Sequence, residues 1–177
     1  MKKGISIILI IITFLIIYFL QVNFFNWFTI AGIKPNLFVI FILFISLFTD
    51  TKIGVSLGIF FGIFLDIIIG RSIGISAIMY GVIGLLGGYF NKNFSKDSRI
   101  TIILMVIAST ALYEIGSYMF SVIQLSIQIE LMSFIKILLI EIFYNIILTI
   151  ILSTILQKLG YRLEDIFKGQ KILTRYF

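Results

Sequence analysis

Six long apolar stretches, separated by short polar breaks, make up almost the whole of this 177-residue chain. They cover roughly residues 4–22, 35–50, 53–70, 73–90, 100–122 and 133–157. A helix that crosses a bilayer needs about 20 mostly apolar residues, with a range of about 17–25. Because the hydrocarbon core offers backbone groups no water, such stretches must be helical. The pattern therefore predicts an all-α integral membrane protein, a six-transmembrane-helix bundle. Its second span is short, and Pro35 fits the first turn of that helix.

Composition supports the assignment to membrane proteins and excludes most kinds of catalytic and metal-binding site. Hydrophobic residues make up 60% of the chain and charged residues 12%, against about 25% charged residues in soluble domains. Cysteine and histidine are both absent, which excludes disulfides, the usual zinc sites, thiol nucleophiles and Ser–His pairs. Asp50 and Asp66 lie near opposite membrane faces, without a phosphotransfer cluster of acids. We therefore expect no enzyme, no cofactor and no metal.

Basic residues predict the orientation of the spans. With six spans and both termini in the cytoplasm, Lys34 and Arg71 lie outside and Lys136 falls within the last span. The other 11 of the 14 lie inside: Lys2, Lys3, Lys52, Lys92, Lys96, Arg99, Lys158, Arg162, Lys168, Lys171 and Arg175. This is a strong positive-inside bias. The net charge of +6 is then explained by anionic lipid, and we expect the bilayer rather than nucleic acid as partner.

The chain divides into a six-helix transmembrane bundle, residues 1–157, and a basic amphipathic cytoplasmic tail, residues 158–177. The tail mixes cations with apolar residues, as segments on the inner membrane surface do; binding to a cytoplasmic protein is the alternative. In the outer loop at residues 23–34, aromatic residues suit the membrane interface. The outer loop at residues 124–133 alternates apolar and polar residues. That period predicts an extended segment, either lying on lipid or forming an edge for a partner.

Glycines recur every four residues in the third stretch and beyond. The stripe consists of Gly54, Gly58, Gly62, Asp66, Gly70 and Gly74. Residues four apart share a helix face, and small residues on one face let another helix approach closely. The fourth stretch carries a similar stripe through Ala77, Gly81, Gly84 and Gly88. We expect these two spans to pack tightly, against each other or a common neighbour; a homodimer formed through the glycines is the alternative.

Acidic residues lie in the outer half of three spans. The candidate intramembrane polar network comprises Asp66, Glu114, Glu141 and Asn145. Polar residues are costly in lipid, so these faces should point into the bundle. Two interpretations stay open: a small-molecule or proton site in an outward-facing pocket, or a hydrogen-bonded network that fixes helix register. We also expect at least one of the three acids to be paired or neutral.

Two segments resemble one family. Gly32-Ile33-Lys34-Pro35-Asn36-Leu37 opens the second span, and the Gly54–Asp66 stripe follows in the third. A KPNL sequence followed by a G-x3-G-x3-G-x3-D helix resembles the rod shape-determining protein family MreD, and length and hydropathy agree across nearly the whole chain. The resemblance marks Pro35, Asn36, Gly58, Gly62 and Asp66 as family-typical residues for packing or partner docking.

This resemblance implies a non-catalytic scaffold of the bacterial elongation machinery in the cytoplasmic (inner) membrane. Its expected partners are the bitopic protein MreC, the actin-like filament protein MreB and the membrane enzymes of peptidoglycan synthesis. The implied fold is similar to the six-helix substrate-binding subunits of energy-coupling-factor transporters. A small-molecule-binding subunit of a vitamin-type transporter is therefore the alternative function. That class usually carries small residues, often alanines, on its first helix, whereas residues 4–22 contain no alanine.

Overall fold

The structure, a computed structural model, describes residues 2–69, 74–94, 96, 98–125 and 130–167. Six longer helices dominate this part of the chain, one in each predicted stretch, so the all-helical prediction is confirmed. They are α1 (Lys2–Phe19), α3 (Leu37–Phe48), α4 (Thr51–Ile69), α5 (Ile75–Asn93), α6 (Arg99–Leu125) and α7 (Leu131–Phe167). After α1 come a π-helical turn, η1 (Leu20–Phe24), and the short α2 (Phe25–Trp27).

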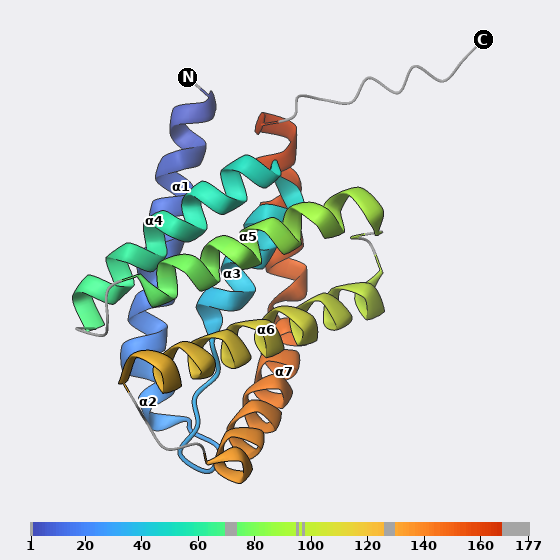
Figure 1. The fold of residues 1–177 in the computed structure, drawn as a ribbon. Helices are drawn as coiled ribbons and strands as arrows, with labels where there is room; N and C mark the ends of the chain where they lie inside the picture. The colour runs from blue at the N-terminus through green and yellow to red at the C-terminus, as the bar shows by residue number, and fades with distance from the viewer. Residues whose placement is uncertain (1, 70–73, 95, 97, 126–129, 168–177) are drawn as a thin grey trace.

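The helices form two groups that cross each other (Figure 1). α1, α3 and α7 run along the length of the molecule, and α4, α5 and α6 lie across them. α4 and α5 are side by side, and α1 begins at the same end of the molecule at which α7 ends. Four segments have the length and apolar composition to cross a membrane: Ile7–Trp27, Thr51–Ile69, Arg99–Gln124 and Leu131–Phe167.

The central helix α3 is the hydrophobic core of the molecule. All 12 of its residues are buried, and it contacts α1, α4, α5, α6 and α7. At 1.5 Å per residue it is about 18 Å long, well short of a hydrocarbon core of about 30 Å. Asn36 is its N-cap, with its Oδ1 accepting from the Val39 N–H at 3.3 Å. Pro35 therefore precedes the helix, and its predicted place in the first turn was wrong.

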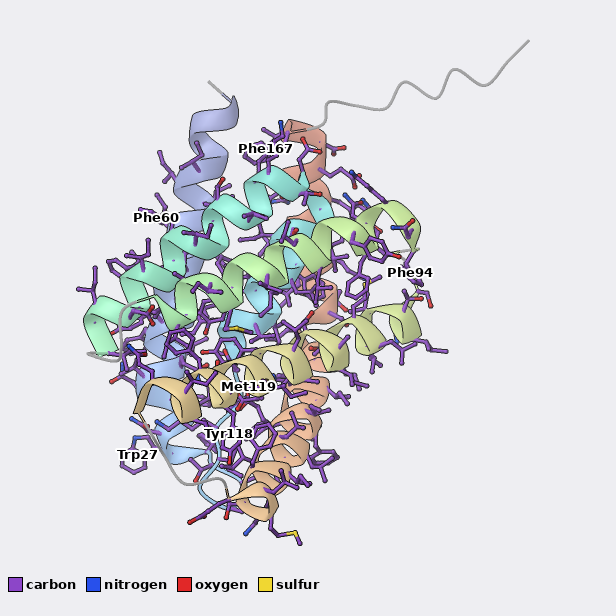
Figure 2. All side chains as sticks on the ribbon, in the orientation of Figure 1. Trp27, Phe60, Phe94, Tyr118, Met119 and Phe167 are labelled. Carbon is purple, nitrogen blue, oxygen red and sulfur yellow. The ribbon has the colours of Figure 1, made fainter. Side chains whose placement is uncertain are left out.

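Large apolar side chains cover the outside of the bundle, as expected where lipid is the solvent. Trp27, Phe60, Phe94 and Met119, which are labelled in Figure 2, are more than half exposed. Trp27, which is 88% exposed, lies at the end opposite the start of α1. Of the aromatic residues predicted for an interface belt, only Phe25 is buried, at 7% exposure; Phe24, Trp27 and Phe28 are exposed.

Two predicted boundaries differ from the structure. α7 does not end near residue 157 but continues to Phe167, and Gly160 on this extension is buried against the ring of Phe48. The predicted extended loop at residues 124–133 was wrong at both ends, which belong to α6 and α7. There the helical hydrogen bonding outweighs a short alternating pattern. Residues 126–129 and 168–177 lie outside the described residues.

Candidate functional site

The glycine stripes bring α4 and α5 into backbone contact. A Cβ added at Gly58 would collide with the carbonyl group of Tyr80, and one at Gly62 with the backbone of Ala77. From the other side, a Cβ at Gly84 would meet the backbone of Gly54. The three α4 glycines at 54, 58 and 62 are all buried. Within the described residues, this face is therefore covered by the chain itself.

α3 joins the same interface through one hydroxyl group. The Ser46 hydroxyl donates to the Gly84 carbonyl oxygen, and Ser46 also occupies the space that a side chain at Gly54 or Gly87 would need. The last predicted member of the stripe behaves differently. Gly74 has a φ of +109° and no atom within 4 Å of an added Cβ, so it serves the turn before α5, where glycine has no steric penalty. Gly70 lies outside the described residues.

Asp66 holds the beginning of α5. Its Oδ2 accepts from the Gly74 N–H at 2.8 Å and its Oδ1 from the Ser76 N–H at 3.3 Å. The first N–H groups of a helix have no partner within it, and a carboxylate is well suited to them. Asp66 is 1% exposed, which is tolerable because both of its oxygens are hydrogen-bonded. The acid of the α4 stripe thus fixes α4 to α5.

The segment before α3 is not helical, and side chains satisfy its backbone. Gln21 donates to the Pro35 carbonyl oxygen at 2.6 Å and accepts from the Leu37 N–H at 3.0 Å. Asn145 of α7 accepts from the Asn36 N–H at 2.8 Å and donates to the Thr110 hydroxyl at 3.0 Å. Irregular backbone at membrane depth persists only where such partners exist. These two amide side chains therefore satisfy the backbone groups of the non-helical segment that leads into α3.

Glu141 lies one helical turn before Asn145 and faces another acid. It is 6% exposed, and its carboxyl group lies against the side chains of Glu114 on α6 and Asn36. Two carboxyl groups can hydrogen-bond to each other only when one carries a proton. Oε1 of Glu141 is buried and has no hydrogen-bond partner. Glu141 and Glu114 thus lie together, whereas the carboxylate of Asp66 bonds to the start of α5.

A cavity of about 600 Å³ opens beside this pair of acids; we call it the polar cavity. Side chains that line it include Tyr18, Gln21, Asn36, Tyr80, Glu114 and Glu141. The ring of Tyr80 is stacked on that of Tyr113, which also lines the cavity, with centroids 5.0 Å apart and an interplanar angle of 18°. Lys34 lines the cavity too, and its ammonium group donates a hydrogen bond to Asn26 Oδ1.

Comparison with protein-family models decides the family. The model described as rod shape-determining protein MreD matches residues 1–162. The chain belongs to the MreD family. It is therefore a multi-pass membrane protein with a non-catalytic role in determining rod shape. Comparisons with curated proteins and with solved structures give no match.

In this MreD-family chain, the residues around the polar cavity that were not predicted from the sequence include Gln21, Tyr80 and Tyr113. Gln21 had a signal, because it is a polar amide near the end of an apolar stretch. Tyr80 and Tyr113 had none, since tyrosines are common in membrane helices and only the fold stacks these two rings. Of the other predicted cations near this surface, Lys136 is exposed, and Arg71 lies outside the described residues.

Proposed function

We propose that this protein is a membrane scaffold of the bacterial elongation machinery. It binds an MreC-type bitopic membrane protein and connects it, directly or indirectly, to the actin-like MreB filament and to the peptidoglycan-synthesising membrane enzymes. The observation that carries the proposal is the MreD family match, which extends over residues 1–162 and so includes all six longer helices almost completely. A scaffold of this kind works by binding alone.

The proposed topology has six crossings, with both termini in the cytoplasm and a fold similar to the vitamin-binding transport subunits. Support comes from the distribution of lysine and arginine along the sequence. The common end at which α1 begins and α7 ends agrees with it (Figure 1). α3 is too short to cross alone, but a helix buried on every side needs no contact with lipid. The hydrogen-bonded segment before it can complete the crossing.

We assign the partner-binding role to the outer faces of the helices rather than to the glycines. Gly54, Gly58 and Gly62 are already covered inside the chain, which favours internal packing over a glycine-mediated homodimer. Pro35, Asn36 and Asp66 then act indirectly, by fixing the segments that precede α3 and α5. The basic tail, residues 158–177, is proposed to meet the inner membrane surface, with its first part held on the bundle by the ion pair between Lys96 and Glu164.

Depletion microscopy tests the scaffold proposal. Depletion in a rod-shaped host should make the cells round and swollen, and a tagged copy should co-purify with an MreC-type protein and with wall-synthesis enzymes. Restoring the unmodified chain is the control and should return the rods. Cells that keep their shape after complete depletion would contradict the proposal.

A transport subunit is the second candidate, and the polar cavity of about 600 Å³ favours it. Ligand pockets typically measure about 300–1,000 Å³. Under this alternative, depletion leaves cell shape unchanged, and a vitamin-like ligand raises the melting temperature, because binding to the folded state stabilises it. The two readouts separate the candidates in one strain.

A further inference from the structure

Among the described residues, Glu141 is the one buried acid that keeps a carboxyl oxygen without a hydrogen-bond partner. Asp66 accepts from two N–H groups of α5, and Glu164 is paired with Lys96. Glu141 instead faces Glu114 at the edge of the polar cavity and keeps a buried oxygen without a partner. A buried acceptor without a hydrogen bond is destabilising, and more so when it is charged, so its retention calls for an explanation.

The other polar groups on the cavity wall show what kind of ligand would fit. The Gln21 amide donates to the Pro35 carbonyl oxygen, and the Lys34 ammonium group is held by Asn26. The Tyr80 hydroxyl lies 3.4 Å from Asn36 Oδ1. Each of these donor groups already has a partner within the protein, whereas the buried Oε1 of Glu141 is an acceptor without one. A complementary ligand must bring hydrogen-bond donors.

We propose that the polar cavity binds an organic cation, an ammonium or guanidinium group, through the carboxyl group of Glu141. Such a group supplies donors and charge together, and charge-assisted hydrogen bonds are roughly twice as strong as neutral ones. The stacked Tyr80 and Tyr113 rings on the same wall suit a cation as well, because aromatic faces attract positive charge. The volume leaves space for an alkyl chain beside the charged head.

This inference goes beyond the scaffold function and does not depend on it. The cation could be a free small molecule or the end of a lysine or arginine side chain on a neighbouring membrane protein. Both sources offer the same chemistry to Glu141. Binding is therefore measured first with simple probes, and the source is identified separately.

The first experiment uses the purified full-length chain in detergent, with n-butylammonium and n-butylguanidinium as probes. Equilibrium dialysis should give saturable binding of one probe per chain, and the melting temperature should rise by about 3 °C at ten times the dissociation constant. Butanol and butyrate, which match the chain length without the positive charge, should produce neither effect. Absence of saturable binding to the unmodified protein overturns the proposal, whether the cavity holds only a proton or another residue of the chain supplies the cation.

The matched variants are Glu141→Gln and Glu130→Gln. Glu141→Gln replaces the carboxyl group by an amide that cannot ionise, at nearly constant shape, and should weaken binding at least tenfold. Glu130 is exposed and does not line the cavity, so its variant should bind like the unmodified chain. Equal affinity in all three proteins would overturn the assignment to Glu141. Should Glu141→Gln not fold, the dialysis result on the unmodified chain still decides whether a cation site exists.

The second experiment separates the two sources. A photo-crosslinking amino acid replaces Ile137, which lines the cavity, in living cells. A protein adduct mapped to a lysine or arginine assigns the cation to a neighbouring protein. A low-mass amine retained by the purified chain in native mass spectrometry, without a protein adduct, assigns it to a small molecule. Cell shape is not a readout in either experiment, so failure here leaves the scaffold proposal unaffected.

Discussion

The α4–α5 pair and the N-terminal helix α1 are joined to the rest of the molecule in opposite ways. α4 and α5 meet through glycines, so closely that added Cβ atoms would collide with backbone atoms of the other helix. α1 has one glycine, Gly4, with open space around it. Of the side chains described on α1, only Ile10 and Phe14 are buried, and a cavity of about 440 Å³ lies between the N-terminal part of this helix and α4.

The difference shows what holds helices together when the solvent is lipid. Lipid tails are as apolar as leucine, so helix association depends on close packing and hydrogen bonds rather than on a hydrophobic driving force. The α4–α5 pair has both, since Asp66 adds hydrogen bonds to the glycine contact. α1 relies chiefly on aromatic contacts: Phe14 stacks on Phe61 with centroids 4.0 Å apart. A binding partner that alters the conformation of the protein should therefore displace α1 more easily than α4 or α5.

Replacing Gly58 by leucine should have the largest effect. The new side chain would meet the Tyr80 carbonyl group, and a helix backbone cannot yield as a flexible side chain can. We expect Gly58→Leu to remove most of the folded monomer in fluorescence-detected size-exclusion chromatography. Gly4→Leu is the matched control, because nothing lies within 4 Å of an added Cβ there. Wild-type levels of folded protein for Gly58→Leu would show that the glycine contact is dispensable.

Asp66→Ala should have the next largest effect. It deprives the N–H groups of Gly74 and Ser76 of their acceptor in a buried place, at a cost of about 3 kcal/mol. A lowered thermal midpoint, with hydrogen exchange accelerated first at the start of α5, is the expected result. Asp165→Ala, at an exposed carboxylate, should leave the midpoint unchanged. Equal midpoints for the two variants would contradict the role given to Asp66.

Phe14→Ala should have a smaller effect that is confined to α1. The substitution removes the ring that stacks on Phe61. We expect a loss below the roughly 3–5 kcal/mol seen for phenylalanine in soluble cores, because lipid tails are as apolar as the site they would contact. Because the chain has no cysteine, a single cysteine placed on α1 can report its accessibility to a thiol reagent. Ile16→Ala, at a position that is 54% exposed, should differ from the unmodified protein by less than about 0.5 kcal/mol. Similar results for Phe14→Ala and Ile16→Ala would mean that α1 is held by other contacts.

Much of this fold could be predicted from the sequence, and the failures have physical causes. Six apolar stretches predicted six longer helices, because helix is the form that satisfies an isolated backbone in lipid. The glycine spacing predicted close approach of two spans. The shortness of α3 was predicted, but the place of Pro35 at its start and the end of α7 were missed. Helix ends depend on tertiary contacts such as that of Gly160 with Phe48.

The candidate site was predictable only as residue types. Glu114, Glu141 and Asn145 stood out because burying polar groups in a membrane costs free energy. The sequence could not show which of them bond to the backbone and which face a cavity. In the structure, Asn145 accepts a hydrogen bond from the Asn36 N–H, and Asp66 accepts one from the Gly74 N–H at the start of α5. Gln21 entered the site because η1 and the segment before α3 bring it to Pro35, 14 residues away along the chain.

Local composition was enough to establish where this chain resides, because hydrophobicity and the placement of cations act through the solvent that each segment meets. Which small residue faces which helix, and which acid is left with a spare oxygen, depends on distances between segments far apart in the chain. Those distances depend on how the other helices enclose α3. The tertiary structure therefore decided which polar residues hydrogen-bond to backbone groups and which line a cavity.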